Sequence, residues 1–391
     1  FLNAVSTIPF YVERCDHFWI CAPPAVHADL NEVRDFSTWR NRGWCRLEET
    51  TNLLSRTLKM PVVVTNQTRI ETYGFLDGLQ YFYGRPERAA VNGRFTCCVR
   101  GHRVKLEDGT TRQLPCDKEV ITPVLEHMFR TLFESEGGNM DALKRNSLSV
   151  AAPAFFAGDK SKSFSQTETV DHFCQRAGFE NLDDVDKLGW TPLLWAACMA
   201  DIRVVKGIAA KRPGMILTRP KIPERLSILS CAMWRPPSEF AEIMNLDERF
   251  RTPEELDIQT PLGYTPVDRA AKYGFHENLR TMLALRAEVD PVRKDNGDTP
   301  LLSAAREGYP LCCKALLQYG CKVNSVDKEG KTALHLSCKP WAIVGNPEPN
   351  ARLEVIKILM EARIDILAED ENCLTALEIA KQDNFQPAVQ L

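Results

Sequence analysis

The alternation of hydrophobic and polar positions is most regular in the C-terminal half of the chain, where one short motif keeps returning. Each copy has a turn residue, one variable residue, a threonine and a small apolar run, as in Gly-Trp-Thr-Pro-Leu-Leu-Trp-Ala-Ala. Clear copies begin at Gly189, Gly263, Gly297 and Gly330, and a weaker copy begins at Cys373. Glycine fits a tight turn with positive φ, and threonine followed by proline is typical of a helix start. The motif therefore predicts a turn that leads into a helix in every copy.

A second apolar stripe follows the motif and predicts a second helix. The stripes comprise Leu279, Met282 and Leu283, then Cys312, Leu316 and Leu317, then Val355, Ile356, Ile358 and Leu359. Thr191 and Thr265 lie 74 residues apart, which leaves room for a degenerate copy at Ser227. We therefore expect six repeats, anchored at Thr191, Ser227, Thr265, Thr299, Thr332 and Thr375. One repeat cannot bury its apolar face alone, so neighbouring repeats must stack.

The spacing of the anchoring threonines is that of a known repeat family. Thr265 and Thr299 are 34 residues apart, and Thr299 and Thr332 are 33 apart. With its turn and two helices, the motif resembles the ankyrin repeat. The resemblance implies an all-α solenoid that binds other proteins. Thr332 and Thr375 are 43 residues apart, so we expect an insertion around Trp341, which is either part of a binding face or a plain surface loop.

The N-terminal half has a different pattern, in which short apolar runs flank a helical stretch. His17–Ala22 and Met60–Thr65 are mostly apolar, as in buried parallel strands. Trp39–Leu58 lies between them and places several leucines on one side of a helix. Strand, helix and strand in this order predict a parallel pair joined by a right-handed crossover. We expect the end of a helix over Ile8–Arg14 and a loop over 25–38.

Further along, residues 67–90 are rich in aromatic side chains and are expected to form a helix that closes this unit. A small antiparallel meander should follow, because the next runs alternate between apolar and polar residues. Its strands are expected at Arg94–Arg100, Arg103–Glu107 and Thr110–Leu114, with a hairpin turn at Asp108 and Gly109. Ile121–Glu136 has the apolar spacing of an amphipathic helix.

Four potential metal ligands lie close together in the meander, namely Cys97, Cys98, His102 and Cys116. Zinc sites usually contain pairs of cysteines that are separated by a few residues. Cys97 and Cys98 are adjacent, and adjacent side chains point to opposite faces of a strand. We therefore predict no metal site and no cofactor here.

The segment around Trp44 carries a more specific motif. Trp44 and Cys45 are followed, after two intervening residues, by Glu48 within the expected helix. Over residues 11–65 this order resembles the second part of a plant-type TIR domain. The resemblance implies cleavage of NAD with Glu48 as the catalytic carboxylate, which suits the positive charge that develops when a glycosidic bond breaks. The family's first strand would precede Phe1, so we expect further sequence there, with room for a targeting segment.

Length and composition predict a multidomain α+β protein. The 391 residues allow two or three domains. We expect a partial TIR-like α/β unit with a β-hairpin over 1–136, a linker over 137–168 and an all-α ankyrin solenoid over 169–391. A net charge of -3 lacks the basic excess of a nucleic-acid binder, and no apolar run approaches the ~20 residues of a membrane span. The 14 cysteines fall mostly in helical stripes, which favours the cytoplasm or another reducing compartment.

Three functions remain open: a protein-binding module, a TIR-like NAD-cleaving enzyme that uses Glu48, and a structural subunit of a larger assembly. The first is favoured, with other proteins contacting the turns and inner helices of the repeats. Candidate partner-binding residues are Trp190, Trp195, Tyr264, Arg269, Arg293, Asp295, Arg306, Lys328 and Trp341. Asp186, Asp298 and Asp327 are expected beside them on exposed turns. Each could equally be ordinary surface, and Trp341 is the strongest candidate because tryptophan is enriched at interface hot spots.

Overall fold

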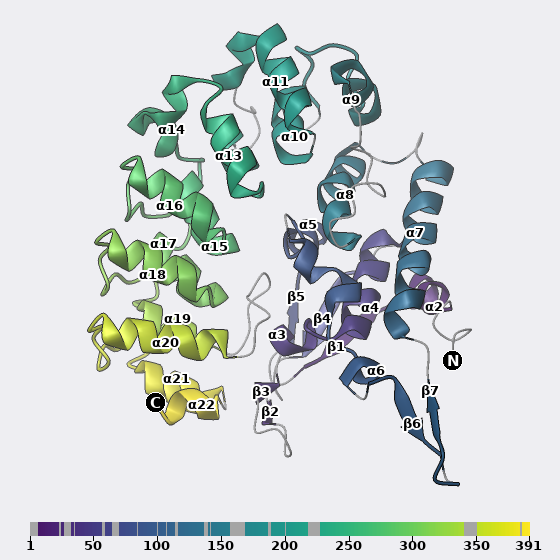
Figure 1. Ribbon diagram of the computed structural model, residues 1–391. Helices are drawn as coiled ribbons and strands as arrows, with labels where there is room; N and C mark the ends of the chain where they lie inside the picture. Colours follow the sequence, from purple (N-terminus) through teal and green to yellow (C-terminus); the bar gives the residue numbers. More distant parts are fainter. Residues whose placement is uncertain are drawn as a thin grey trace. The chain divides into compact units, whose positions relative to one another are not determined.

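In the computed structural model the chain divides into two compact units. The first comprises Phe1–Pro23 and Arg34–Phe164, and the second comprises Pro24–Val33 and Ser165–Leu391. The structure describes residues 7–22, 25–26, 33–34, 36–56, 59–64, 70–83, 85–99, 101–106, 108–113, 116–136, 140, 142–156, 169–186, 189–199, 201–217, 227–339, 350–383 and 385–391. Helices dominate both units, and the first also contains a small sheet (Figure 1).

The first unit is built around a three-stranded sheet with the strand order β1-β4-β5. β1 (Phe18–Cys21) and β4 (Pro61–Val64) are parallel, and Ile20 lies opposite Val63 in the buried centre of the pair. β5 (Ile70–Thr72) is antiparallel to β4. The parallel pair that the apolar runs predicted is therefore confirmed, and the third strand runs in the opposite direction.

The crossover between β1 and β4 contains α4 (Gly43–Leu54), against which α2 (Ile8–Arg14) packs. α4 is shorter than the helix expected over Trp39–Leu58, because the chain becomes extended at Ser55, where ψ is 145°. Its first residue is necessarily glycine, since a Cβ on Gly43 would lie 1.8 Å from the ring of Phe95.

Two expectations for the N-terminal half are wrong in detail. Residues 25–38 contain β2 (Ala25–Val26), β3 (Val33–Arg34) and the start of α3 (Phe36–Trp39) instead of a plain loop. Residues 67–90 contain β5, α5 (Phe75–Gln80), a 3-10 turn at Pro86–Arg88 and the start of another, Ala90–Asn92, instead of one helix. Gly74 and Pro86 explain the interruption, because both residue types are unfavourable inside a helix.

The expected meander is correct for its hairpin only. β6 (Arg103–Lys105) and β7 (Thr111–Gln113) are antiparallel, and Gly109 has a φ of 84° in the turn. The strand expected at Arg94–Arg100 is wrong, because these residues contain α6 (Thr96–Val99). Cys97 and Cys98 therefore do not alternate across a strand.

Two longer helices complete the first unit. α7 (Asp117–Glu136) is the amphipathic helix that the apolar spacing predicted, and Leu125 is among its buried residues. α8 (Ala142–Phe155) lies within 137–168, where we expected a linker. Leu148 and Phe155 of α8 are buried, so residues 142–155 are a packed helix of the first unit and not part of a linker.

The main part of the second unit, Ser165–Leu391, starts with α9 (Val170–Ala177) and continues, within the described residues, as six pairs of helices stacked in sequence order (Figure 1). The first helices are α10 (Pro192–Met199), α12 (Ile228–Ala232), α15 (Pro266–Tyr273), α17 (Pro300–Glu307), α19 (Ala333–Ser337) and α21 (Ala376–Gln382). The second helices are α11 (Ile202–Lys211), α13 (Pro237–Met244), α16 (His276–Ala284), α18 (Pro310–Gln318), α20 (Ala351–Glu361) and α22 (Gln386–Val389). η4 (Pro213–Leu217), η5 (Glu248–Arg251) and α14 (Pro253–Leu256) lie between the first three pairs. The six pairs match the six repeats expected from the sequence.

The anchoring residues of the motif cap the first helices, as predicted. Thr265 Oγ1 accepts a hydrogen bond from the Asp268 N–H at 3.1 Å, and Ser227 Oγ accepts one from the Ser230 N–H at 3.1 Å. The same bond is present at Thr191, Thr299 and Thr375. The alanine pairs that follow are fully buried between neighbouring helices, for example at Ala270 and Ala271. Small residues are needed there because the helices approach closely.

Candidate functional site

The turns that precede the first helices of repeats three to six are joined edge to edge. We call residues 260–264, 293–298, 327–331 and 370–374 the fingers. One backbone hydrogen bond links each finger to the next: the Lys294 N–H donates to Leu262 O at 2.9 Å, the Lys328 N–H to Asn296 O at 2.9 Å and the Glu371 N–H to Glu329 O at 3.0 Å. The fingers therefore form one continuous edge of the second unit.

A glycine allows this close approach in each of the first three fingers. Gly263, Gly297 and Gly330 have φ values of 87°, 79° and 72°. A Cβ on Gly263 would lie 2.7 Å from the backbone nitrogen of Lys294, and one on Gly297 would lie 3.0 Å from that of Lys328. Glycine alone has both the conformational freedom and the space. The motif glycine therefore serves repeat stacking as well as the turn.

A recurring aspartate, which sequence reasoning placed on the exposed surface, holds the turns closed. Asp327 Oδ1 accepts a hydrogen bond from the Lys331 N–H at 2.9 Å, and Asp370 Oδ1 accepts one from the Leu374 N–H at 3.1 Å. Asp186 makes the same contact in the first repeat, with the Trp190 N–H at 2.9 Å. The signal was in the sequence, as an aspartate three residues before the turn residue of the motif.

Trp190 and Trp195 are buried, which corrects the expectation that they are exposed. Their ring centroids are 4.4 Å apart. The indole N–H of Trp195 donates to the carboxylate of Asp186 at 2.8 Å. Both tryptophans and this aspartate therefore form the packed turn of the first repeat. A tryptophan ring can be buried when its indole N–H has a hydrogen-bond partner, and Asp186 is that partner for Trp195.

Tyr264, Arg293 and Asp295 form one cluster across two fingers. The guanidinium of Arg293 lies 3.9 Å from the ring centroid of Tyr264 and donates to its hydroxyl. The same group forms an ion pair with Asp295. Arg293 is buried, Tyr264 is half-buried, and Asp295 is exposed. Arg293 was expected on the surface, but stacking and pairing place it between the fingers, where it holds the cluster together.

The charged cluster continues into the next finger through Arg306, which is half-buried. Its guanidinium lies 2.6 Å from Asp298 and 3.4 Å from Asp327. Asp298 and Asp327 are buried, which corrects the expectation of exposed turn carboxylates. One arginine therefore links two successive fingers.

Arg269 is also buried, with its guanidinium 5.3 Å from the ring of Tyr264. The neighbouring Asp268 is fully buried and accepts a hydrogen bond from the Ser303 hydroxyl at 2.8 Å. Burial raises the pKa of the Asp268 carboxyl, against the opposing charge of Arg293. These two residues belong to the interior of the array.

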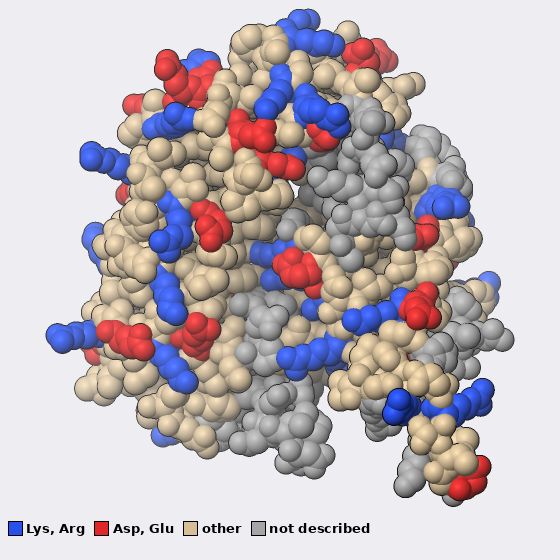
Figure 2. Space-filling view, viewed as in Figure 1, with Lys and Arg blue, Asp and Glu red and all other residues tan. Residues whose placement is uncertain are grey.

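The side chains that remain exposed along the fingers have mixed chemistry. They are Pro261, Leu262, Lys294, Asp295, Lys328, Glu329, Glu371, Asn372 and Cys373. Val292 and Val326 lie in or beside the fingers and are 56% and 50% exposed. In the face shown in Figure 2, acidic and basic side chains are interspersed over the molecule. Of the insertion expected over 341–350, all residues except Asn350 lie outside the described residues, and Trp341 is among them.

In the first unit, Glu48 is half-buried on α4, and burial raises its pKa against the opposing charge of Arg42. It forms no hydrogen bond or ion pair with another described residue. Its neighbour Glu49 is fully enclosed: it pairs with Arg40 and accepts a hydrogen bond from the Tyr73 hydroxyl at 2.7 Å. Sequence reasoning missed this buried group, because its members come from three separate segments.

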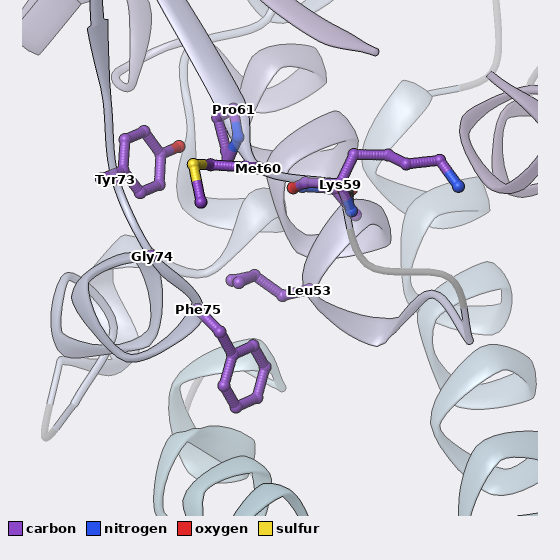
Figure 3. A pocket seen from close by; sticks show the side chains of 8 residues that line it. Leu53, Lys59, Met60, Pro61, Tyr73, Gly74 and Phe75 are labelled. Atoms are coloured by element: carbon purple, nitrogen blue, oxygen red, sulfur yellow. Dashed lines mark hydrogen bonds between the residues drawn. The ribbon is translucent and has the colours of Figure 1, made fainter. Parts of the chain in front are cut away.

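A cavity of about 160 Å³ lies at the end of α4. Its lining consists of Asn52, Leu53, Lys59, Met60, Pro61, Tyr73, Gly74 and Phe75. Figure 3 shows Met60 beside Tyr73, with Leu53 and Phe75 further along the cavity. Ligand pockets for drug-sized molecules usually have ~300 Å³ or more, so this cavity is too small for NAD. Glu48 is not part of its lining.

Comparison with known families identifies the repeats. Residues 248–327 and 267–370 match a family model described as ankyrin repeats, with three copies. The C-terminal half contains ankyrin repeats. The match covers the array from the third repeat to the finger of the sixth, and the helix pairs and caps described above extend the same pattern to both sides.

The known proteins that resemble this chain include a potassium channel and an ankyrin repeat domain of known structure. Potassium channel AKT2/3 of Arabidopsis thaliana is 26% identical over 129 residues, which are 27% of this chain and 16% of that protein. The chain thus spans about a sixth of the length of this curated relative. The crystal structure of the ankyrin repeat domain of Bcl-3, described as a unique member of the IkappaB protein family, has 20% sequence identity and a TM-score of 0.42, covering 57% of this chain and 90% of that one. Among the residues that the structure describes, no helix is long and apolar enough to cross a membrane.

Proposed function

We propose that the second unit is a protein-binding module and that its fingers contact the partner. Stacked ankyrin repeats create extended surfaces for binding other proteins. The observation that carries the proposal is the row of exposed side chains on fingers that are bonded to one another at Leu262, Asn296 and Glu329. A surface that is ordered before binding loses less conformational entropy when the partner arrives.

The chemistry of the row indicates the class of partner. Lys294 and Lys328 are exposed beside Asp295 and Glu329, so neither sign of charge dominates. Exposed apolar side chains such as Val326 lie among these charges. Protein interfaces combine an apolar centre with polar and charged groups in this way. The row therefore fits a protein surface that also presents both charges.

Charge reversal on one finger tests the proposal. Lys294→Glu changes an exposed side chain without touching the buried cluster, and Lys357→Glu on α20 is the matched control, an exposed lysine on an outer helix. A photo-crosslinking amino acid placed at position 294 or at position 357 then reports contacts. We expect one defined protein to be captured from position 294 only, and we expect Lys294→Glu to weaken that complex while the control variant binds normally.

Two outcomes count against finger recognition. Equal capture from both positions would mean that the fingers are not the contact. Co-purification of several proteins at constant stoichiometry, unaffected by Lys294→Glu, would favour the structural subunit of a larger assembly.

A second candidate is NAD cleavage by Glu48 in a TIR-like first unit. Two observations favour it, the parallel pair of β1 and β4 with α4 between them, and a half-buried carboxyl whose pKa is raised. A glycoside-cleaving site needs such a carboxyl group. The test is nicotinamide release from NAD by the full chain and by a form extended before Phe1. Release that disappears in Glu48→Ala supports the enzyme, and no release from either form removes it.

A further inference from the structure

Four potential metal ligands converge in the first unit, where α6 meets the hairpin of β6 and β7. The ligand atoms of Cys97, Cys98, His102 and Cys116 all lie within 4.8 Å of one another. The sulfur atoms of Cys97 and Cys98 are 3.9 Å apart, and those of Cys98 and Cys116 are 3.8 Å apart. The cluster is unrelated to the fingers and to Glu48, and the proposed functions do not use it.

These separations are those of ligands around one tetrahedral ion. With Zn–S bonds of about 2.3 Å, two sulfur ligands of a tetrahedron lie about 3.8 Å apart. A disulfide would require an S–S distance near 2.05 Å, roughly half of what is present. We propose that Cys97, Cys98, His102 and Cys116 bind one structural zinc ion as a closed site of three thiolates and one imidazole. Four protein ligands without an open position are typical of structural zinc, and thiolate-rich tetrahedral sets favour this metal.

The backbone conformation explains how adjacent cysteines serve one ion. Both lie on the short helix α6, so their side chains do not point to opposite faces as they would on a strand. Gly101 and His102 then have φ values of 61° and 57°, two successive residues in the left-handed region. This turn brings the His102 N–H back onto the carbonyl of Cys97 at 2.8 Å. Positive φ is unfavourable for histidine, and such strain persists where surrounding interactions demand it.

The imidazole lacks the partner that burial would otherwise require. Nε2 of His102 is buried and makes no hydrogen bond to any described residue. Buried polar atoms are nearly always bonded, and an unpaired one calls for an explanation such as an ion. A zinc ion at the neighbouring thiolates would bind one imidazole nitrogen and thereby orient the ring. The cysteines of the repeats differ, because Cys231, Cys312 and Cys338 are buried as small apolar side chains.

The hairpin supplies a structural reason for the ion. β6 and β7 have three residues each, and Arg103, Leu106 and all of β7 are exposed. A single two-stranded hairpin is marginally stable in water. His102 precedes β6 and Cys116 follows β7, so an ion bound by both residues would hold together the two chain segments that enter and leave the hairpin. Structural zinc contributes folding free energy in this way.

Contacts from residues next to the ligands connect the proposed metal site to the rest of the first unit. Asp117 follows Cys116, and its backbone N–H lies within hydrogen-bonding reach of the Cys97 sulfur. Its carboxylate accepts a hydrogen bond from the Trp44 indole N–H at 3.2 Å, and Trp44 packs edge-to-face against Phe95. Such outer contacts orient metal ligands. In this arrangement the tryptophan of the sequence motif around Trp44 supports the metal ligands.

The test measures metal in the full chain, purified under reducing conditions without chelators. Elemental analysis should find one zinc per chain. Substitution with Co²⁺ should give the intense visible absorption and the thiolate charge-transfer band of a tetrahedral thiolate site. Cys98→Ser and Cys116→Ser should each lower zinc affinity more than the ~10–100-fold that loss of an outer contact costs. Cys15→Ser and Cys373→Ser change exposed cysteines elsewhere and should bind zinc normally.

His102→Cys distinguishes a metal site from a fold that fails when altered. A set of four cysteine thiolates is also a zinc site, so this variant should retain stoichiometric metal and gain thiolate charge-transfer intensity with Co²⁺. The proposal is overturned if the full chain retains no stoichiometric zinc. It is equally overturned if Cys116→Ser retains zinc as well as the unaltered chain, or if peptide mass spectrometry of freshly isolated chain finds Cys98 and Cys116 joined as a disulfide.

Discussion

Replacing Glu49 by glutamine should destabilise the first unit strongly, because its charge is the counterion of a buried arginine. The side chains of Arg40 and Glu49 are each only 1% exposed. Glu49 accepts a hydrogen bond from Nε of Arg40 at 3.1 Å and one from the Tyr73 hydroxyl at 2.7 Å. The guanidinium also lies 4.4 Å from the ring of Phe36 and 4.3 Å from that of Tyr81. The arginine is thus enclosed by rings and is paired with the carboxylate of Glu49.

The expected loss is about 3–5 kcal/mol, the range for breaking a buried ion pair by removing one partner. Most of this cost comes from losing the negative charge that faces Arg40, because glutamine can still accept a hydrogen bond. Replacing both members by apolar residues, as in Arg40→Met with Glu49→Leu, should recover most of the loss, since neither charge of the pair then remains buried. The neighbouring Glu48 is only half-buried, so Glu48→Gln should change stability by less than about 1 kcal/mol.

Hydrogen exchange measured by mass spectrometry under native conditions suits this chain, because peptides from α4 and β4 report the free energy of opening of the first unit separately. Peptides from α17 serve as an internal control and should exchange alike in all variants. The reasoning is refuted if Glu49→Gln lowers the opening free energy of α4 by less than about 1 kcal/mol, the range of an ordinary hydrogen bond. A double variant less stable than Glu49→Gln alone would refute it as well.

Two further predictions concern the second unit. Gly297→Ala should lower the free energy of unfolding by at least ~1–2 kcal/mol, because alanine at a φ of 79° is strained and its Cβ would press on the next finger. The control Gly214→Ala should have little effect, because its Cβ meets no atom within 4 Å. Urea unfolding measures both variants, and equal unfolding midpoints would contradict the role given to the finger glycines. The folded chain raises the pKa of Asp268 above the ~3.9 of an unfolded aspartate, so its stabilising contribution is complete below that pH and is lost as the pH rises through the folded pKa. As the pH rises from ~3.9 through the folded pKa of Asp268, the Asp268→Asn variant should therefore lose less stability than the unaltered chain. An unchanged dependence of stability on pH would contradict the raised pKa of Asp268.

The repeats could be predicted from sequence because their signals are local. The cap at Thr265, the turn at Gly263 and the paired alanines of α15 all fall within one short window, and each acts on its immediate neighbours. Because the same motif recurs in successive repeats, each copy supports the interpretation of the others. Exposure could not be predicted from the sequence. Arg293 and Asp298 are typical of a surface turn, but Arg293 is buried against Tyr264 of the neighbouring finger, and Asp298 is buried where it pairs with Arg293 and Arg306. Several residues that were chosen as partner-binding candidates by their residue type are therefore buried inside the array.

The first unit was predicted less well because its defining contacts join distant segments. The parallel pair was found from two apolar runs, each recognisable alone. Arg40, Glu49 and Tyr73 carry no local sign that they form one buried group, since polar residues at such positions are usually solvated. The third strand was missed for a similar reason, because Ile70–Thr72 is too short to stand out beside the aromatic residues that follow it.

The cysteines show most clearly why residue type and spacing do not settle chemistry. In the repeats, Cys231 and Cys312 lie deep in helical stripes, where they behave as small apolar residues. Cys97 and Cys98 were judged by the rule for strands, and that rule failed because the chain forms a helix there and then turns through Gly101 and His102. Two backbone angles, invisible in the sequence, bring an imidazole and three thiols within reach of one ion. Whether a cysteine is packing or ligand is therefore decided by the turn beside it.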